Sequence, residues 1–175
     1  MNRALFLDRD GIIIKDVSYP HKIEDLIINN EIIPYLKHFL ELGFKLIIVT
    51  NQAGISKGKF TMDQYKEFQK ELINRLSFLG VYITDTYFCP YHKDGVVEPF
   101  NVDSYDRKPK PGMFLKAAKD HNIDISRSFM IGDKFSDIIE LESLKCYILE
   151  SEYNRGEPGT YTTVDDIFWE INSEL

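Results

Sequence analysis

Residues 5–11 read LFLDRDG, an apolar run that ends on two carboxylates two residues apart. The apolar part fits a buried strand, and Gly11 lets the chain turn away after it. If the extended geometry continues to Asp10, the side chains of Asp8 and Asp10 lie on the same side of the chain, because strand side chains alternate. Two like charges this close repel each other unless a cation or a shared proton holds them. The stretch is therefore either a solvated turn after a strand or a cation site at the end of one.

Outward from this stretch, short β-rich runs alternate with helical patterns. We expect strands over residues 4–8, 45–50, 82–89, 128–132 and 146–149. Several of these runs are continuously apolar, which is typical of strands covered on both faces. Helices are expected over 32–40 with Gly43 as the stop, over 61–79 after a capping box that starts at Thr61, and from Pro111 onward. Apolar spacing predicts two more, over 138–144 and near 164–171.

This alternation predicts an α/β fold in which a parallel sheet is doubly wound by helices. A length of 175 residues fits one domain, and we expect residues 1–175 to form it. Ligands in such sheets bind at the carboxyl ends of the strands. The piece over 90–110 has no periodicity and is long for a compact domain, so we expect it to serve the site.

Bulk properties exclude several classes of protein. The net charge of −7 argues against a nucleic-acid-binding surface, which normally needs a basic face. No stretch approaches the roughly 18 apolar residues of a membrane span. The cysteines, Cys89 and Cys146, make no disulfide framework, and no secretory pattern opens the chain, so we expect a cytoplasmic protein.

Polar clusters stand at four predicted strand ends. They are Asp8 and Asp10, then 50–52 (TNQ), then Arg107 and Lys108 beyond the long piece, then Asp133 and Lys134. Each cluster alone fits an ordinary turn or cap, but the fold brings all four to one crevice. Three carboxylates indicate a hard, oxygen-ligated cation, and Mg²⁺ is the usual choice in phosphate sites. Lysine, hydroxyl and amide donors suit phosphoryl oxygens, so the clusters together predict phosphoryl transfer.

Four segments, in order, resemble the motifs of haloacid dehalogenase (HAD)-type phosphatases: 8–11 (DRDG), 50–51 (TN), Lys108 and 132–137 (GDKFSD). The segments 16–19 (DVSY), 50–60 (TNQAGISKGKF) and 107–113 (RKPKPGM) narrow the resemblance. They resemble the D-glycero-D-manno-heptose 1,7-bisphosphate 7-phosphatase and histidinol-phosphatase family. The resemblance covers about residues 4–150 and implies a HAD-like fold with no large cap domain.

The resemblance implies a role for each matching residue. Asp8 is the nucleophile that forms an aspartyl-phosphate, and Asp10 is the acid and base. Mg²⁺ is held by Asp8, Asp133 and the Asp10 backbone carbonyl, with Asp137 supporting the site from behind. Thr50 and Lys108 stabilise the phosphoryl group. The sugar and its second phosphate are contacted by Asp16, Tyr19, Asn51, Gln52, Arg107 and Lys134, and a guanidinium such as that of Arg107 binds phosphate bidentately.

The chain departs from this family in its long loop, which in the family binds structural zinc through Cys-x-His and Cys-x-Cys. Cys89 matches, but Tyr91, Ser104 and Asp106 replace the other three ligands, and His92 lies one residue late. Structural zinc sites prefer four sulfur or nitrogen ligands. We therefore expect no zinc and a loop ordered by the packing of Tyr91, Phe100 and Tyr105.

The resemblance implies a phosphoric monoester hydrolase that removes the C7 phosphate of a small sugar bisphosphate. This reaction serves nucleotide-activated heptose biosynthesis for lipopolysaccharide, capsule or another surface glycan. Three alternatives remain: a histidinol-phosphate phosphatase, a polynucleotide 3′-phosphatase, or a catalytically silent binding module. We expect a monomer with no nucleic-acid or membrane partner.

Overall fold

The computed structural model describes residues 1–175 and has a six-stranded sheet in which all neighbouring strands are parallel, in the order β3-β2-β1-β4-β5-β6. The strands are β1 (Arg3–Leu7), β2 (Phe44–Asn51), β3 (Ile83–Cys89), β4 (Phe129–Gly132), β5 (Lys145–Leu149) and β6 (Thr160–Tyr161). The helices are α1 (Ile33–Glu41), α2 (Met62–Phe78), α3 (Gly112–His121) and α4 (Val164–Ser173). The parallel α/β fold and its first five strands agree with the sequence-based prediction, whereas the short β6 was not expected.

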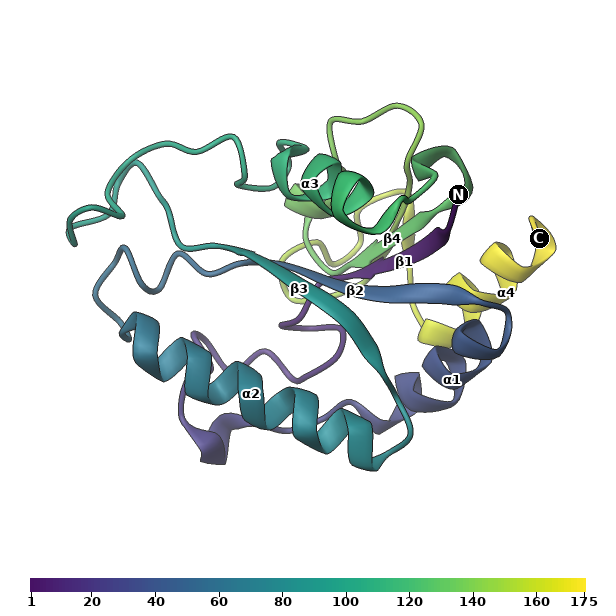
Figure 1. Ribbon diagram of the computed structural model, residues 1–175, viewed down its shortest axis with the longest axis horizontal. Coiled ribbons are helices and arrows are strands. Elements are labelled where there is room, and N and C mark those ends of the chain that lie inside the picture. Colours follow the sequence, from purple (N-terminus) through teal and green to yellow (C-terminus); the bar gives the residue numbers. More distant parts are fainter.

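Helices cover both faces of the sheet, with α3 on one face and α1, α2 and α4 on the other (Figure 1). Alternation along β1 divides its side chains between the two layers of core: Leu5 and Leu7 face the α1, α2 and α4 side, while Ala4 and Phe6 face α3. Every residue of the middle of β1 is buried, which explains its continuous apolar run.

Local sequence explains where the helices begin and end. The Thr61 side chain accepts a hydrogen bond from the Gln64 amide, and the Gln64 side chain accepts one from the Thr61 amide, which completes the predicted capping box of α2. Gly43 follows α1 with φ of 81°, a conformation that favours glycine. None of the helices is long and apolar enough to cross a membrane.

The prediction of a helix over residues 138–144 is wrong. A 3₁₀ turn, Phe135–Asp137, ends just before this stretch, and the chain is irregular from there up to β5. Backbone amides of this stretch bond to distant residues instead of to a helical turn. The Glu140 amide donates to the Pro109 carbonyl, and the Ile139 amide donates to Cys146 Sγ at 3.5 Å. Ile139 and Leu144 are buried against α3 without helical geometry. Their apolar spacing therefore reflects two separate anchoring points rather than one helix face.

Two aromatic side chains also differ from expectation. As the only tryptophan, Trp169 on α4 is expected in the core, but it is 71% exposed because the opposite face of the helix, with Phe168 and Ile171, packs on the sheet. Tyr105 was predicted to pack the long loop, but it is 60% exposed. The other two aromatic residues predicted to pack the loop, Tyr91 and Phe100, do contact each other, with ring centroids 5.9 Å apart.

Candidate active site

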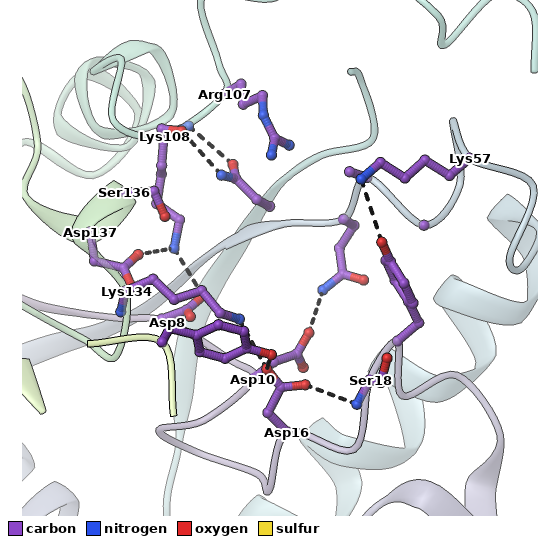
Figure 2. A pocket seen from close by; sticks show the side chains of 16 residues that line it. Asp8, Asp10, Asp16, Ser18, Lys57, Arg107, Lys108, Lys134, Ser136 and Asp137 are labelled. Carbon is purple, nitrogen blue, oxygen red and sulfur yellow. Dashed lines mark hydrogen bonds and ion pairs between the residues drawn. The ribbon is translucent and has the colours of Figure 1, made fainter. Parts of the chain in front are cut away.

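A polar cavity of ≈ 290 Å³ opens at the carboxyl ends of the strands (Figure 2). Ten of the predicted site residues line it: Asp8, Asp10, Asp16, Tyr19, Asn51, Gln52, Arg107, Lys108, Lys134 and Asp137. The other two lie next to it, because Thr50 contacts Gln52 and the carboxylate of Asp133 lies within 4.8 Å of that of Asp8. The fold thus brings together side chains that are up to 129 residues apart in sequence (from Asp8 to Asp137).

Lys108 joins two buried carboxylates at the base of the cavity. Its Nζ lies 2.9 Å from Asp8 Oδ1 and 2.5 Å from Asp137 Oδ1, and all three side chains are buried. Burial disfavours the charged ammonium, but Asp137 and Asp8 together raise the pKa of Lys108. Burial also raises the pKa of Asp8, and the attraction of Lys108 only partly offsets this. The lysine therefore stays charged beside Asp8.

Asp133 is the carboxylate in this group that lacks a hydrogen-bond donor. Its Oδ1 is buried without any hydrogen-bond partner. Burial, reinforced by repulsion from Asp8, raises the pKa of Asp133 to about 8. Gly11 makes this placement possible, since a Cβ there would lie 2.2 Å from Asp133 Oδ2. A buried carboxylate oxygen with no donor fits a site that holds a cation.

Both carboxylate oxygens of Asp137 already accept hydrogen bonds, and three of its roughly four acceptor positions are filled. Oδ1 accepts from Lys108, and Oδ2 accepts from the backbone amides of Asp133 at 3.2 Å and Lys134 at 3.1 Å. Its closeness to Gly132, where a Cβ would meet the Asp137 side chain at 2.2 Å, explains the second glycine of the site. These contacts favour the supporting role predicted for Asp137.

Asp10 is held by Arg9, a residue that the sequence reasoning did not select. Arg9 Nε lies 2.7 Å from Asp10 Oδ1, and its Nη2 lies 3.2 Å from Asp10 Oδ2. The guanidinium is fully buried and lies over the Phe68 ring, 4.8 Å from its centroid. β1 ends at Leu7, so Asp8 and Asp10 leave regular strand geometry, yet both line the cavity. The sequence signal that could have identified Arg9 is its position between the two carboxylates Asp8 and Asp10.

The end of β2 supplies amide and hydroxyl groups. Gln52 Nε2 donates to Thr50 Oγ1 at 2.9 Å and to Asp10 Oδ2 at 3.2 Å. Asn51 Oδ1 accepts from the Lys108 amide at 3.0 Å, and its Nδ2 donates to the Lys108 carbonyl at 3.2 Å. Asn51 therefore fixes the backbone that carries Lys108, in addition to lining the cavity.

Two further cations line the cavity: Lys57 lies across it from Asp137, and Arg107 is seen at the top of the view near Lys108 (Figure 2). Arg107 Nη1 is buried with no hydrogen-bond partner, and burial lowers the pKa of this guanidinium from its ordinary value. Lys57 Nζ lies 3.5 Å from the hydroxyl of Tyr19. Tyr19 is reached through a strained turn, since Ser18 and Tyr19 have φ of 61° and 59°. A desolvated, unpaired guanidinium in a cavity wall fits an anionic ligand.

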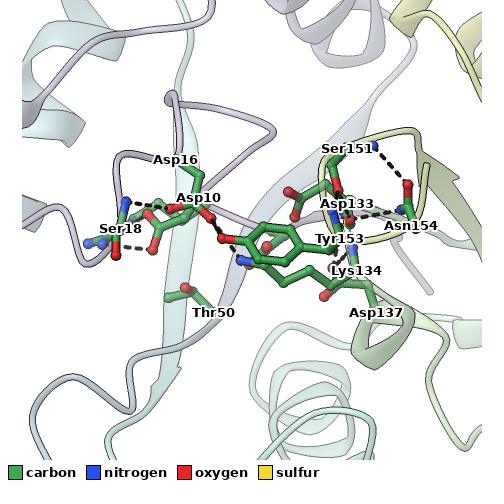
Figure 3. A network of polar contacts seen from close by, with 12 residues as sticks. Asp10, Asp16, Ser18, Thr50, Asp133, Lys134, Asp137, Ser151, Tyr153 and Asn154 are labelled. Carbon is green, nitrogen blue, oxygen red and sulfur yellow. Dashed lines mark hydrogen bonds and ion pairs between the residues drawn. The ribbon is translucent and has the colours of Figure 1, made fainter. Parts of the chain in front are cut away.

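The loop after β5 also reaches the site, although the sequence analysis selected no residue in it (Figure 3). Asn154 is 2% exposed, and its Nδ2 donates to the carbonyls of Asp133 and Leu149, both at 3.0 Å. Ser151 Oγ donates to the same Asp133 carbonyl at 2.7 Å. These bonds bring Tyr153 to the cavity wall. The short 151–154 segment, SEYN, has no motif that would have identified it.

The residues at the expected zinc-loop positions lie on and after the end of β3. Cys89 is buried, and its Sγ lies 3.9 Å from the Tyr91 carbonyl oxygen. His92 Nδ1 accepts a hydrogen bond from the Asp94 amide at 3.1 Å. The prediction that this loop needs no zinc stays a prediction.

The fold and this site together define a HAD-like phosphatase. A family model described as Polynucleotide kinase 3 phosphatase matches residues 4–171. The chain is 42% identical over 159 residues to the D-glycero-alpha-D-manno-heptose-1,7-bisphosphate 7-phosphatase of Photorhabdus laumondii, covering 89% of this chain and 87% of that protein. The chain belongs to the D-glycero-D-manno-heptose-1,7-bisphosphate 7-phosphatase family.

Other relatives agree with this placement. The D-glycero-beta-D-manno-heptose-1,7-bisphosphate 7-phosphatase of Yersinia pestis is 41% identical over 135 residues, or 77% of this chain and 72% of that protein. A Mesorhizobium loti structure described as a HAD-like phosphatase superposes with a TM-score of 0.86 at 28% identity, covering 98% of this chain and 85% of that one. The D,D-heptose 1.7-bisphosphate phosphatase of B. bronchiseptica, solved with magnesium and phosphate, has the same fold, with a TM-score of 0.80 at 19% identity and 99% of both chains covered.

Proposed function

We propose that the chain is a Mg²⁺-dependent phosphatase that hydrolyses the C7 phosphate of D-glycero-D-manno-heptose 1,7-bisphosphate. Relatives about 40% identical to the chain are named for this reaction. The observation that carries the substrate assignment is the unpaired, buried Nη1 of Arg107. Lys108 lies beside Asp8 and would bind the phosphate that is transferred there. Arg107 would then bind a second phosphate of the same substrate.

In the proposed reaction, an Asp8 carboxylate oxygen attacks phosphorus, and the bond from phosphorus to the sugar oxygen breaks. Asp10 gives its proton to the departing sugar oxygen. Asp10 then takes a proton from water, whose oxygen attacks the aspartyl-phosphate and releases inorganic phosphate and Asp8. Lys108 and Thr50 donate to the phosphoryl oxygens, on which negative charge is concentrated.

The cation assignment follows from the oxygens that remain available. Asp8 and Asp133 would hold Mg²⁺ through their carboxylates, together with the Asp10 backbone carbonyl, which accepts no backbone hydrogen bond. Asp137 would stay in its supporting position, since Lys108 and two backbone amides already fill three of its roughly four acceptor positions. Mg²⁺ in this site supplies positive charge beside the transferring phosphoryl group.

Histidinol phosphate is the nearest alternative substrate, because its phosphatases share most of these motifs. It carries a single phosphate, which leaves Arg107 without a partner. A polynucleotide 3′-phosphatase is favoured by the description of the matching family model. It is disfavoured by the net charge of −7, which gives no basic surface for a nucleic-acid backbone.

A phosphate-release panel tests the proposal. Purified protein with Mg²⁺ is given both anomers of the heptose bisphosphate, histidinol phosphate and a 3′-phosphorylated oligonucleotide, with the Asp8→Asn variant as the blank. We expect the highest kcat/KM on a heptose bisphosphate. Faster turnover of histidinol phosphate or of the oligonucleotide would reassign the substrate, and no release from any of them would favour a silent binding module.

Two further expectations belong to this proposal. We expect a monomer, and light scattering after size exclusion measures this. Cys89 and Cys146 are free thiols, which supports a protein of the reducing cytoplasm.

A further inference from the structure

Tyr153 lines the cavity and lies on the loop after β5, which hydrogen bonds hold in place. The loop is fixed by Asn154 and Ser151, which both bond to the carbonyl of Asp133. Tyr153 itself is half exposed, lines the cavity and extends toward Asp16 (Figure 3). Its hydroxyl donates to Asp16 Oδ2 at 2.9 Å, and its ring lies 4.4 Å from Lys134 Nζ. No step of the proposed reaction involves Tyr153.

The contacts of Asp16 limit what that carboxylate can do for a ligand. A carboxylate has about four acceptor positions. Asp16 Oδ2 accepts from Lys134 Nζ at 3.0 Å and from Tyr153, and Oδ1 accepts from the Ser18 amide at 3.1 Å. One position on Oδ1 therefore remains. Asp16 can accept from one ligand hydroxyl, and a second hydroxyl nearby needs another acceptor.

The Tyr153 oxygen is available as such an acceptor. Its single proton is committed to Asp16, which leaves the oxygen lone pairs without a donor. The pKa of Tyr153 is raised to about 12 by burial and by the hydrogen bond to Asp16, so the hydroxyl keeps this proton at neutral pH. The donated bond holds the phenol oxygen beside Asp16 in the cavity wall.

We propose that Tyr153 contacts the substrate and, together with Asp16, accepts hydrogen bonds from neighbouring sugar hydroxyls, so that the cavity selects a polyhydroxylated bisphosphate. This inference rests on the proposed sugar-bisphosphate activity and adds a residue that determines specificity. Lys108 and Arg107 account for the two phosphates, whereas Asp16 and Tyr153 account for hydroxyls of the sugar. A phosphate ester that lacks those hydroxyls gains nothing from Tyr153.

The test compares Tyr153→Phe with the wild-type protein on two ligands. One is the heptose 1,7-bisphosphate, and the other is heptane-1,7-diol bisphosphate, which keeps both phosphates and has no other hydroxyl. The diol is measured as a substrate or as a competitive inhibitor. We expect the preference for the sugar over the diol to fall about three- to tenfold, the effect of one neutral hydrogen bond, mainly through KM. Tyr82→Phe is the matched control, because Tyr82 is 64% exposed and does not line the cavity.

An unchanged preference in Tyr153→Phe would overturn the inference, as would an equal loss on both ligands, which would mean that Tyr153 acts through Lys134 or the fold. Tyr153→Ala also removes the ring over Lys134 and should lower the preference at least as much as Tyr153→Phe. Melting temperatures of both variants report folding. If the wild-type protein does not act on the heptose bisphosphate, the proposed function itself fails, which is a different result from an active protein whose preference ignores Tyr153.

Discussion

The two sides of the cavity are built differently. The side that would take the transferred phosphate lies mainly at strand ends, where Asp8, Lys108, Asp133 and Asp137 are all buried and Lys108 bonds to both Asp8 and Asp137. The side that would take the sugar is made by loops, and Tyr19 and Tyr153 are 37% and 50% exposed. Chemistry that needs fixed geometry is thus placed on the sheet, and substrate selection is placed on loops that can vary without disturbing it.

This contrast predicts two kinds of variant. Changes on the strand-end side should lower turnover for every substrate or destabilise the fold, because those side chains are buried and interlocked. Changes on the loop side should alter which phosphate ester is preferred.

The largest effect is expected for Asp8→Asn. The amide keeps the shape of the side chain but cannot attack phosphorus, so kcat should fall by more than about 10⁴-fold on every substrate. Phosphate release measures this, and an unchanged melting temperature serves as the control for folding. Turnover within tenfold of wild type would rule out an aspartyl-phosphate at this position.

Arg9→Met should cost about 3–5 kcal/mol of unfolding free energy, because it leaves the partly buried Asp10 carboxylate without its cation. Urea denaturation measures the change. Arg127→Met, at an exposed position, should stay within about 0.5 kcal/mol. If Arg9→Met lowers the free energy of unfolding by no more than the control does, the ion pair with Asp10 does not stabilise the strand-end side as its contacts indicate.

Arg107→Met should raise KM for the heptose bisphosphate about 10- to 100-fold, the effect of losing one charge-assisted hydrogen bond. KM for a heptose 7-phosphate, which lacks the second phosphate, should change much less. Lys59→Met removes an exposed cation outside the cavity and provides the comparison. Equal losses on both substrates would place Arg107 with the transferred phosphate instead.

The smallest effect concerns pH and Mg²⁺. The pKa of Asp133, about 8 in the folded protein without metal, lies above its ordinary value of 3.8. The folded state therefore binds this proton more tightly than the unfolded state does. The stability that this proton binding contributes is lost as pH rises from about 4 through 8. Because Mg²⁺ needs the ionised carboxylate, we expect Mg²⁺ to raise the melting temperature about 2–4 °C more at pH 8.5 than at pH 6. Thermal denaturation checks this, and the difference should vanish in Asp133→Asn.

Much of the strand-end side could be predicted from sequence. Asp8, Thr50 and Asp133 stand at the ends of strands, and the carboxyl ends of parallel strands meet at one edge of a sheet. Their positions follow from that rule once the strands are located, whereas Lys108 lies beyond the long loop, just before α3, and its place rested on the family resemblance. Arg9 was missed because its importance depends on α2, whose Phe68 lies under the guanidinium.

The loop side could not be predicted in the same way. Tyr153 has no motif around it, and it reaches the cavity only because Asn154 bonds to Asp133, 21 residues earlier in the chain. The failed helix over residues 138–144 has the same origin, since contacts with Pro109 and Cys146 replace the local hydrogen bonds of a helix.

The amino-acid sequence by itself determined the parallel α/β fold, the four polar clusters and the phosphoryl-transfer chemistry they imply. These depend on local periodicity and on the fixed direction of parallel strands. Only the tertiary structure decided which oxygens remain free for a cation, that Arg107 is buried without a partner, and that Tyr153 belongs to the site. Those properties depend on hydrogen-bond satisfaction and burial, which are set by residues distant in sequence and exist only after the chain has packed.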